Sequence, residues 1–282
     1  MRRLATEETA PAGQDDDPTH AFAAFEHVPG TLEAGLILLC DHASNALPPG
    51  YGSLGLPKAE LERHIGYDIG AAGVTRMLAH RLGCPALLTR FSRLLIDPNR
   101  GEDDPTLVMR LSDGAVVPGN RNVDEAEVER RLERYHRPYH AAVEAEIDAA
   151  LAKGVVPAIL SMHSFTAVWR GLARPWHAAV LWDSDPRFTR ELIDALAAPG
   201  DLMVGDNEPY DGALRGDCMY RHGTLRGLAH TLLEIRQDLI TDEDGQRDWA
   251  DRLAGLLPDM LAKPELHEVR SFGSRTGPVP PI

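Results

Sequence analysis

The stretch LILLCDHASN, residues 36–45, passes without a break from five apolar residues to a run of small and polar ones. A short, continuous apolar run predicts a strand that is buried on both faces of a sheet. The polar run that follows contains Asp41 and His42, whose side chain types bind metals, transfer protons and hold substrates. We therefore expect a strand over residues 36–40 and a functional site where this strand ends.

The rest of the chain alternates apolar runs with segments of helical periodicity. Further strands are predicted over residues 86–91, 93–97, 156–162, 177–182, 201–205 and 228–235, and helices over residues 68–82, 124–153, 186–197 and 246–262. Pro138 predicts a bend in the longest helix, and residues 98–121 form a long loop of the kind that is often functional. This alternation favours a three-layer α/β/α fold with a mostly parallel, mixed central sheet.

Composition excludes several classes of protein. The chain of 282 residues has a formal net charge of −14 and no basic stripe, which argues against a nucleic-acid partner. It has no apolar run of about 18 residues, so no membrane span is expected. Its 3 cysteines are widely spaced and predict neither a disulfide framework nor paired zinc knuckles, which favours a cytoplasmic protein. Residues 1–20 are predicted to be a disordered tail, and residues 21–282 a single α/β domain; the oligomeric state stays open.

Polar side chains gather at the predicted carboxyl ends of the strands. They are Asp41 and His42, then Asp97, Asn99 and Arg100, then His163, Asn207 and Glu234. In open parallel α/β sheets, ligands bind in the crevice outside these ends. Small residues beside both histidines leave room for an ion at about 2.0–2.1 Å from each imidazole nitrogen. The alternative for each histidine is a structural hydrogen bond, and residues 97–100 can equally form an Asx turn.

Glu234 lies inside the apolar run HTLLEI, residues 230–235. An ionised carboxylate in such surroundings costs several kcal/mol unless a partner receives it. That partner is either a buried basic residue, in a structural ion pair, or a water molecule activated by a metal. The two alternatives stay open from the residues alone.

Seven segments, in this order, resemble the N-formylglutamate amidohydrolase family, and most closely its branch of predicted members. They are CDHASN (40–45), HIGYDIGA (64–71), SRLLIDPNR (92–100), SMHSFT (161–166), PWHAAVLWD (175–183), VGDNEPY (204–210) and HTLLEIRQDLI (230–240). The likeness spans roughly residues 25–265. It implies a fold similar to the zinc-dependent exopeptidases and aspartoacylases. It also implies metal-dependent hydrolysis of the N-acyl amide of a small acidic amino acid, giving formate and glutamate in the type reaction of amino-acid metabolism.

The resemblance implies a Zn²⁺ site, or a site for another divalent metal, in which His42 and His163 are the two imidazole ligands. Carboxypeptidase-like enzymes have a Glu three residues after the first His, where this chain has Asn45. Asp68, at the start of the predicted helix, can fill the same place in space. We therefore expect Asp68 as the third ligand, with Asn45 in reserve or in contact with the substrate.

The resemblance also assigns the catalytic and substrate-binding residues. Glu234 resembles the general base that takes a proton from the attacking water. Asn99 and Arg100 resemble the pair that grips a substrate carboxylate, for which a guanidinium offers a bidentate fork. Arg93, Arg170 and Arg236 are candidates for a second carboxylate, and Asn207 is a further candidate contact.

Two other functions compete with metal-dependent hydrolysis of an N-acyl amino acid. Ser44, Ser161 and Cys40 each lie near a histidine, so a nucleophilic hydrolase is possible, although no G-x-S-x-G elbow is present. The Asn at the expected acid position favours, in turn, a non-catalytic or degenerate protein of the same fold that binds a metabolite.

Overall fold

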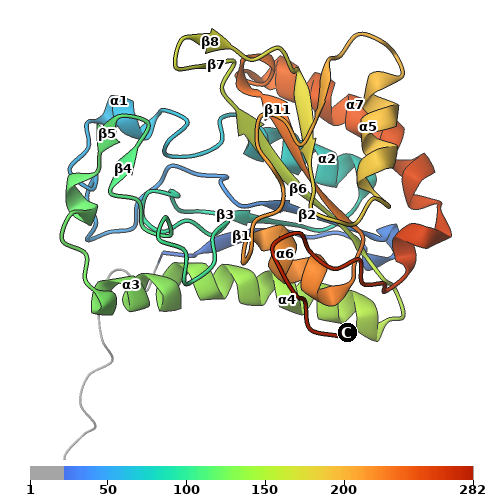
Figure 1. The fold of residues 1–282 in the computed structure, drawn as a ribbon, viewed down its shortest axis with the longest axis horizontal. Coiled ribbons are helices and arrows are strands. Elements are labelled where there is room, and N and C mark those ends of the chain that lie inside the picture. The colour runs from blue at the N-terminus through green and yellow to red at the C-terminus, as the bar shows by residue number, and fades with distance from the viewer. Residues whose placement is uncertain (1–21, 282) are drawn as a thin grey trace, which may run out of the picture.

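The computed structural model describes residues 22–281, in which one seven-stranded sheet forms the centre (Figure 1). Its order is β1 (Phe25–Val28), β3 (Ala86–Thr89), β2 (Leu36–Cys40), β6 (Ala158–Phe165), β11 (His230–Arg236), β9 (Ala178–Leu181) and β10 (Val204–Asp206). Strands β3, β2, β6 and β11 are parallel neighbours, whereas β1 pairs antiparallel with β3 and β9 pairs antiparallel with β11. The predicted mixed, mostly parallel sheet is therefore confirmed.

Helices cover both faces of this sheet. Helices α2 (Ala71–Leu82), α5 (Thr189–Ala197) and α7 (Glu243–Leu261) share one apolar core with the sheet. On the other face, α4 (Arg137–Ala152) and α6 (Cys218–His222) contribute to a second core with Tyr139, Val143 and Ile147. The spacing of these three side chains along α4 is the apolar stripe that a helix needs to pack on a sheet. The three-layer α/β/α prediction is confirmed.

The longest predicted helix is interrupted. Helix α3 (Glu125–Arg131) begins at the cap Asp124, whose side chain accepts from the Glu127 N–H, and a π-helical turn (Leu132–His136) joins it to α4. Pro138 has no N–H to donate to the carbonyl four residues earlier, so the α-helical ladder is broken at this point. The irregularity lies just before the proline and includes the buried His136.

Residues 93–97 form turns and not the predicted strand. Their apolar side chains fill two small cores beneath the long loop: Leu95 and Ile96 in one, Leu94 in the other. A short apolar run is compatible with a buried turn as well as with a strand, and periodicity does not separate them. The same loop contains a small hairpin, β4 (Leu111–Ser112) and β5 (Ala115–Val116).

The remaining elements are peripheral: helix α1 (Lys58–Leu61) and a second hairpin, β7 (Val168–Trp169) and β8 (Leu172–Ala173). The predicted tail, residues 1–20, lies outside the described residues, and the extent of the domain stays a prediction. Within residues 22–281, no helix combines the length and the apolar character that crossing a bilayer requires.

Candidate metal and catalytic site

A cavity of about 290 Å³ opens where the carboxyl ends of β2, β6 and β11 meet. The residues that line it include His42, Asp68, His163, Glu234, Arg93 and Arg100. His42 follows β2 directly, whereas His163 and Glu234 lie within β6 and β11. Parallel strands bring their carboxyl ends to one edge of a sheet, which is why residues far apart in the sequence meet here.

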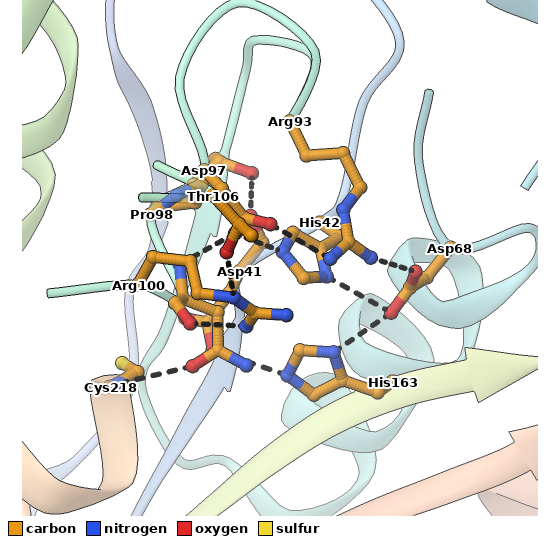
Figure 2. Close-up of polar contacts among 12 residues, drawn as sticks. Asp41, His42, Asp68, Arg93, Asp97, Pro98, Arg100, Thr106, His163 and Cys218 are labelled. Atoms are coloured by element: carbon orange, nitrogen blue, oxygen red, sulfur yellow. Dashed lines mark hydrogen bonds and ion pairs between the residues drawn. The ribbon is translucent and has the colours of Figure 1, made fainter. Parts of the chain in front are cut away.

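Asp68 lies between the two imidazoles (Figure 2). Its Oδ2 is 2.8 Å from Nδ1 of His163 and 3.4 Å from Nδ1 of His42. Asp68 belongs to the turn that precedes α2, and its backbone N–H donates to the His42 carbonyl, which ties this turn to the end of β2. The backbone nitrogen of Ser164 also lies 3.3 Å from Oδ2 and donates to it. The carboxylate therefore contacts residues of β6 and the residue His42 after β2.

The outer nitrogen of each imidazole faces a second carboxylate. Nε2 of His42 is 2.7 Å from Oδ1 of Asp97, and Nε2 of His163 is 3.2 Å from Oδ2 of Asp41. Asp41 is fixed in turn by Tyr139, whose hydroxyl donates to Oδ1 at 2.6 Å. Asp41 therefore orients His163 and not its sequence neighbour His42, which is oriented by Asp97.

These residues fit a divalent metal ion. One ligand atom from each of His42, Asp68 and His163 lies within 4.8 Å of the others, and all three side chains are buried. Two histidines and a carboxylate are a ligand set of catalytic zinc sites. Metal-binding histidines usually donate their other N–H to a carboxylate or carbonyl, as Asp97 and Asp41 allow here.

The charge on Asp68 and the charge on His163 depend on each other. Burial opposes ionisation of Asp68, but the adjacent His42 and His163 hold its pKa well below the usual range. Burial likewise disfavours the charged imidazole of His163, yet hydrogen bonds to Asp41 and Asp68 raise its pKa to about 10. The carboxylates therefore stabilise a positive charge at this place, and a metal ion bound by the neutral imidazoles would take the place of the proton.

Glu234 differs from Asp217, another acid of the cavity, in its hydrogen bonding. Burial raises the pKa of Asp217 to about 7, but Asp217 accepts from the Tyr220 N–H. Glu234 is only 8% exposed, and its Oε2 has no hydrogen-bond partner among the residues that the structure describes. Burial raises its pKa to about 7. The alternative of a structural ion pair is not supported, because no salt bridge to Glu234 occurs within residues 22–281. A buried carboxylate in this state can accept and release a proton near neutral pH.

Basic and amide side chains also line the cavity. Nη2 of Arg93 is 2.8 Å from Oδ2 of Asp97, and its Nη1 is 3.6 Å from Asp68, so Arg93 balances the acids of the cluster. Arg100 donates from Nη1 to the Asn99 carbonyl and from Nε to Thr106. The Asn99 side chain accepts from the Cys218 N–H at 3.0 Å. Both guanidinium groups that line the cavity come from one turn-rich segment, residues 92–100.

Four predicted residues have structural contacts instead and do not line this cavity. The Asn45 amide donates to the Leu61 carbonyl, and Asn207 accepts from the backbone N–H groups of Trp182 and Gly212 in a turn where its own φ is 52°. Arg236 pairs with Asp238, and Arg170 lies over the Trp169 ring. The insertion between Asn45 and Asp68 carries the chain away and returns it, so Asp68 and not Asn45 reaches the imidazoles.

Ser161, two residues before His163, does not line the cavity. Ser161 Oγ is 3.0 Å from Nε2 of His163, and Asp68 lies on the other side of the ring, which superficially resembles a nucleophilic triad. However, Ser161 is fully buried, donates to Asp41 and does not line the cavity. Cys40 is also fully buried, and burial raises the pKa of its thiol well above the ordinary value. Ser161 and Cys40 are therefore not placed to act as nucleophiles, and Ser44 does not line the cavity either.

Some cavity residues are not assigned by the sequence. Asp97 stands at the end of an apolar run, but the sequence does not identify it as the acceptor for His42, because that run is predicted to be a strand. Asp97 lies behind His42 and does not itself line the cavity, whereas His64, Tyr210, Asp217 and Gln237 do. Three of them, His64, Tyr210 and Gln237, lie inside the segments HIGYDIGA, VGDNEPY and HTLLEIRQDLI, and this position is the signal that could have found them.

The family match covers most of the chain. The N-formylglutamate amidohydrolase family matches residues 34–241. By class the protein is thus an amidohydrolase, a hydrolase of amide bonds. The chain belongs to the N-formylglutamate amidohydrolase family. No curated protein sequence matches it significantly.

Solved structures share the fold. The structure of a gene product from Agrobacterium tumefaciens is 32% identical, covers 86% of this chain and 96% of its own, and superposes with a TM-score of 0.80. The N-formylglutamate amidohydrolase from Ralstonia eutropha JMP134 is 21% identical, covers 86% of this chain and 98% of its own, and gives a TM-score of 0.66. At that identity, the second likeness shows the fold.

Proposed function

We propose that the protein is a metal-dependent hydrolase of the N-acyl amide of a small acidic amino acid, with N-formylglutamate or a close analogue as substrate. The observation that carries this proposal is the buried Glu234 carboxylate, whose Oε2 has no partner among the described residues, in one cavity with the His42, Asp68 and His163 cluster. The cavity volume of about 290 Å³ is suited to a small molecule and not to a polypeptide.

We assign His42, Asp68 and His163 as the residues that hold the metal, with Asp97 and Asp41 fixing the two imidazole rings. A bound Zn²⁺ ion supplies Lewis-acid polarisation of the amide carbonyl and lowers the pKa of water. Two histidines and one carboxylate suit several divalent metals, so the ligand set supports the site and leaves the identity of the metal to measurement.

Glu234 acts as the general base in this proposal. The water oxygen forms a bond to the carbonyl carbon while Glu234 accepts the water proton. The C–N bond then breaks, and Glu234 passes the proton to the departing amine nitrogen. A carboxylate with a pKa of about 7 is suited to both steps, because it is neither fully ionised nor fully protonated near neutral pH.

The substrate's own carboxylates need cationic or amide partners. Arg100 and Asn99 are neighbours that line the cavity, and we assign them to one substrate carboxylate. Arg93 lies beside the acids of the cluster and is assigned to the region around the reacting carbonyl or the second carboxylate. Charge-assisted hydrogen bonds of this kind orient a small acidic substrate and select against neutral amides.

The alternative of a non-catalytic metabolite-binding protein rests on Asn45 at the expected acid position. Asp68 lies between the imidazoles, which favours a metal-dependent hydrolase over this alternative. The test is metal analysis of the purified protein, followed by hydrolysis assays on a panel of N-formyl and N-acetyl derivatives of glutamate, aspartate and leucine. We expect bound metal and hydrolysis of the acidic members. Metal-free protein that regains no activity with Zn²⁺, Mn²⁺ or Fe²⁺, and turns over no member of the panel, would refute the proposal.

A further inference from the structure

A second cluster of metal-ligand side chains lies behind the first, between α4 and α6. It consists of His140 from α4 and Cys218 and His222 from α6, which we call the His–Cys–His cluster. One ligand atom from each residue lies within 4.8 Å of the others. The three residues are 1%, 0% and 0% exposed, and none lines the cavity described above. The cluster is thus a separate and closed environment.

The sequence spacing and the contacts of these residues favour coordination. Cys218 and His222 are four residues apart on one helix, so their side chains lie on the same face. Nδ1 of His140 is 2.8 Å from Nε2 of His222, and the other His140 nitrogen, Nε2, donates to the Pro98 carbonyl at 2.9 Å. An imidazole with one nitrogen fixed on a backbone carbonyl and the other facing further ligand atoms has the arrangement of a metal-binding histidine.

A hydrogen bond between the two imidazoles does not satisfy the cluster by itself. The Pro98 carbonyl can only accept, so Nε2 of a neutral His140 carries the hydrogen and its Nδ1 is a lone pair. His222 must then donate from Nε2, which leaves its Nδ1 as a buried lone pair. This Nδ1 has no hydrogen-bond partner in the part of the chain that the structure describes. The hydrogen-bonded pair thus leaves one buried polar atom unsatisfied, at a cost of about 1–3 kcal/mol.

We propose that the His–Cys–His cluster binds a second metal ion, a Zn²⁺ of structural type, through the Cys218 sulfur and the imidazoles of His140 and His222. Thiolate and imidazole ligands select zinc and similar transition metals, whereas Mg²⁺ and Ca²⁺ prefer oxygen. The complete burial of all three residues excludes a substrate from the ion, which favours a structural and not a catalytic role. On binding, the Cys218 thiol gives up its proton to solvent, and the thiolate forms the bond to the metal.

The charges around the cluster are compatible with this ion. The Asp41 carboxylate lies close enough to Cys218 to raise the pKa of its thiol, after the larger effect of burial. A divalent cation, one thiolate and the Asp41 carboxylate sum to zero charge, so the buried ion would be compensated. Arg221, whose charge disfavours protonation of His222, is the opposing cation nearby.

The ion would connect the two sites mechanically. The Cys218 N–H donates to the Asn99 side chain, and the adjacent Asp217 lines the active-site cavity. Fixing Cys218 and His222 to His140 would therefore hold the start of α6, and with it Asn99, in place. The second site acts as a structural clamp between α4 and α6, independent of whether the first site is catalytic.

Cobalt distinguishes the two sites because only one contains sulfur. The protein is produced in medium with Co²⁺ in place of Zn²⁺, and its absorption spectrum and metal content are measured. A thiolate ligand gives a sulfur-to-cobalt charge-transfer band in the near ultraviolet, which the His42, Asp68 and His163 set cannot produce. We expect this band in the wild-type protein and in the His42→Ala/His163→Ala variant, and its loss in Cys218→Ser.

Cys84→Ser is the matched control, because Cys84 is buried far from the cluster in the core beneath α2 and should leave the band unchanged. Cobalt-loaded wild-type protein without a thiolate band, or a band that survives in Cys218→Ser, would overturn the second site. The wild-type spectrum remains decisive even if Cys218→Ser does not fold. Failure of the first site gives a different result: the His42→Ala/His163→Ala variant would then hold as much metal as wild type.

Discussion

Glu234 on β11 is the register partner of His163 on the parallel strand β6. Residues opposite each other in neighbouring strands direct their side chains to the same face of the sheet, so the carboxylate and the imidazole enter the same cavity. Backbone hydrogen bonds on both sides hold β11 between β6 and β9. The proposed base is thus held beside a proposed metal ligand by the sheet and not by a mobile loop.

Glu234→Gln should retain metal but lose turnover by at least about a hundredfold, because the amide cannot accept a proton from water. The amide has nearly the shape of the carboxylate, so the cavity should persist. Steady-state kinetics check the loss of turnover, and metal analysis of the same preparation checks that the metal is retained. Unchanged kcat in this variant would assign the base to another residue.

His42→Ala and His163→Ala should each lose the metal of the first site, since either change leaves two ligands. We expect a drop in bound metal of about one ion per chain and activity below detection, measured by elemental analysis and by the hydrolysis assay. Asn45→Ala is the control, because the Asn45 amide donates to the Leu61 carbonyl and does not line the cavity; this variant should keep full metal content. Loss of metal in Asn45→Ala would restore that residue as a ligand.

Arg100→Met should raise KM for an acidic substrate with little change in metal content. Loss of a charge-assisted hydrogen bond of about 1.5–3 kcal/mol corresponds to a decrease of roughly ten- to a hundredfold in kcat/KM. Arg236→Met removes a guanidinium that pairs with Asp238 outside the cavity and serves as the control. Equal effects of the two substitutions would argue against a substrate carboxylate at Arg100.

Tyr139→Phe should destabilise the fold, because it removes the hydroxyl that donates to the buried Asp41 carboxylate at 2.6 Å. We expect a loss of about 1–3 kcal/mol in the free energy of unfolding, measured by denaturant titration. Metal affinity at the first site should also fall, since Asp41 orients His163. Val143→Ala is the control, because it removes packing from the same face of α4 and no polar contact. It should lower stability without lowering the metal affinity that depends on the orientation of His163.

Stability should decrease as pH falls below about 6.5, in part through His230. Burial lowers the pKa of this imidazole, whose surroundings include Asp183, Asp185 and Arg187. As the pH falls, the unfolded chain therefore binds a proton at this imidazole before the folded protein does. The contribution of His230 to stability is complete above its unfolded pKa and is lost as the pH falls below it. Denaturant titrations at pH 7 and pH 5 should show a smaller loss for His230→Gln than for wild type. An identical loss would exclude His230 as a contributor.

The sequence by itself determined the elements and the residues at their ends. The apolar run 36–40 is strand β2, and His42 after it, together with His163 and Glu234, lines the cavity as expected. These predictions depend on local periodicity and on the rule that parallel strands end at one edge, both of which can be read along the chain.

Only the tertiary structure decided how the polar groups are paired. It put Asp68 rather than Asn45 between the imidazoles, matched Asp41 with His163 and Asp97 with His42, and left Glu234 without a partner among the described residues. It also assembled His140 with Cys218 across two helices. Such pairings depend on strand register, on how an insertion returns to the sheet and on how helices pack, and these are long-range properties that local spacing does not contain.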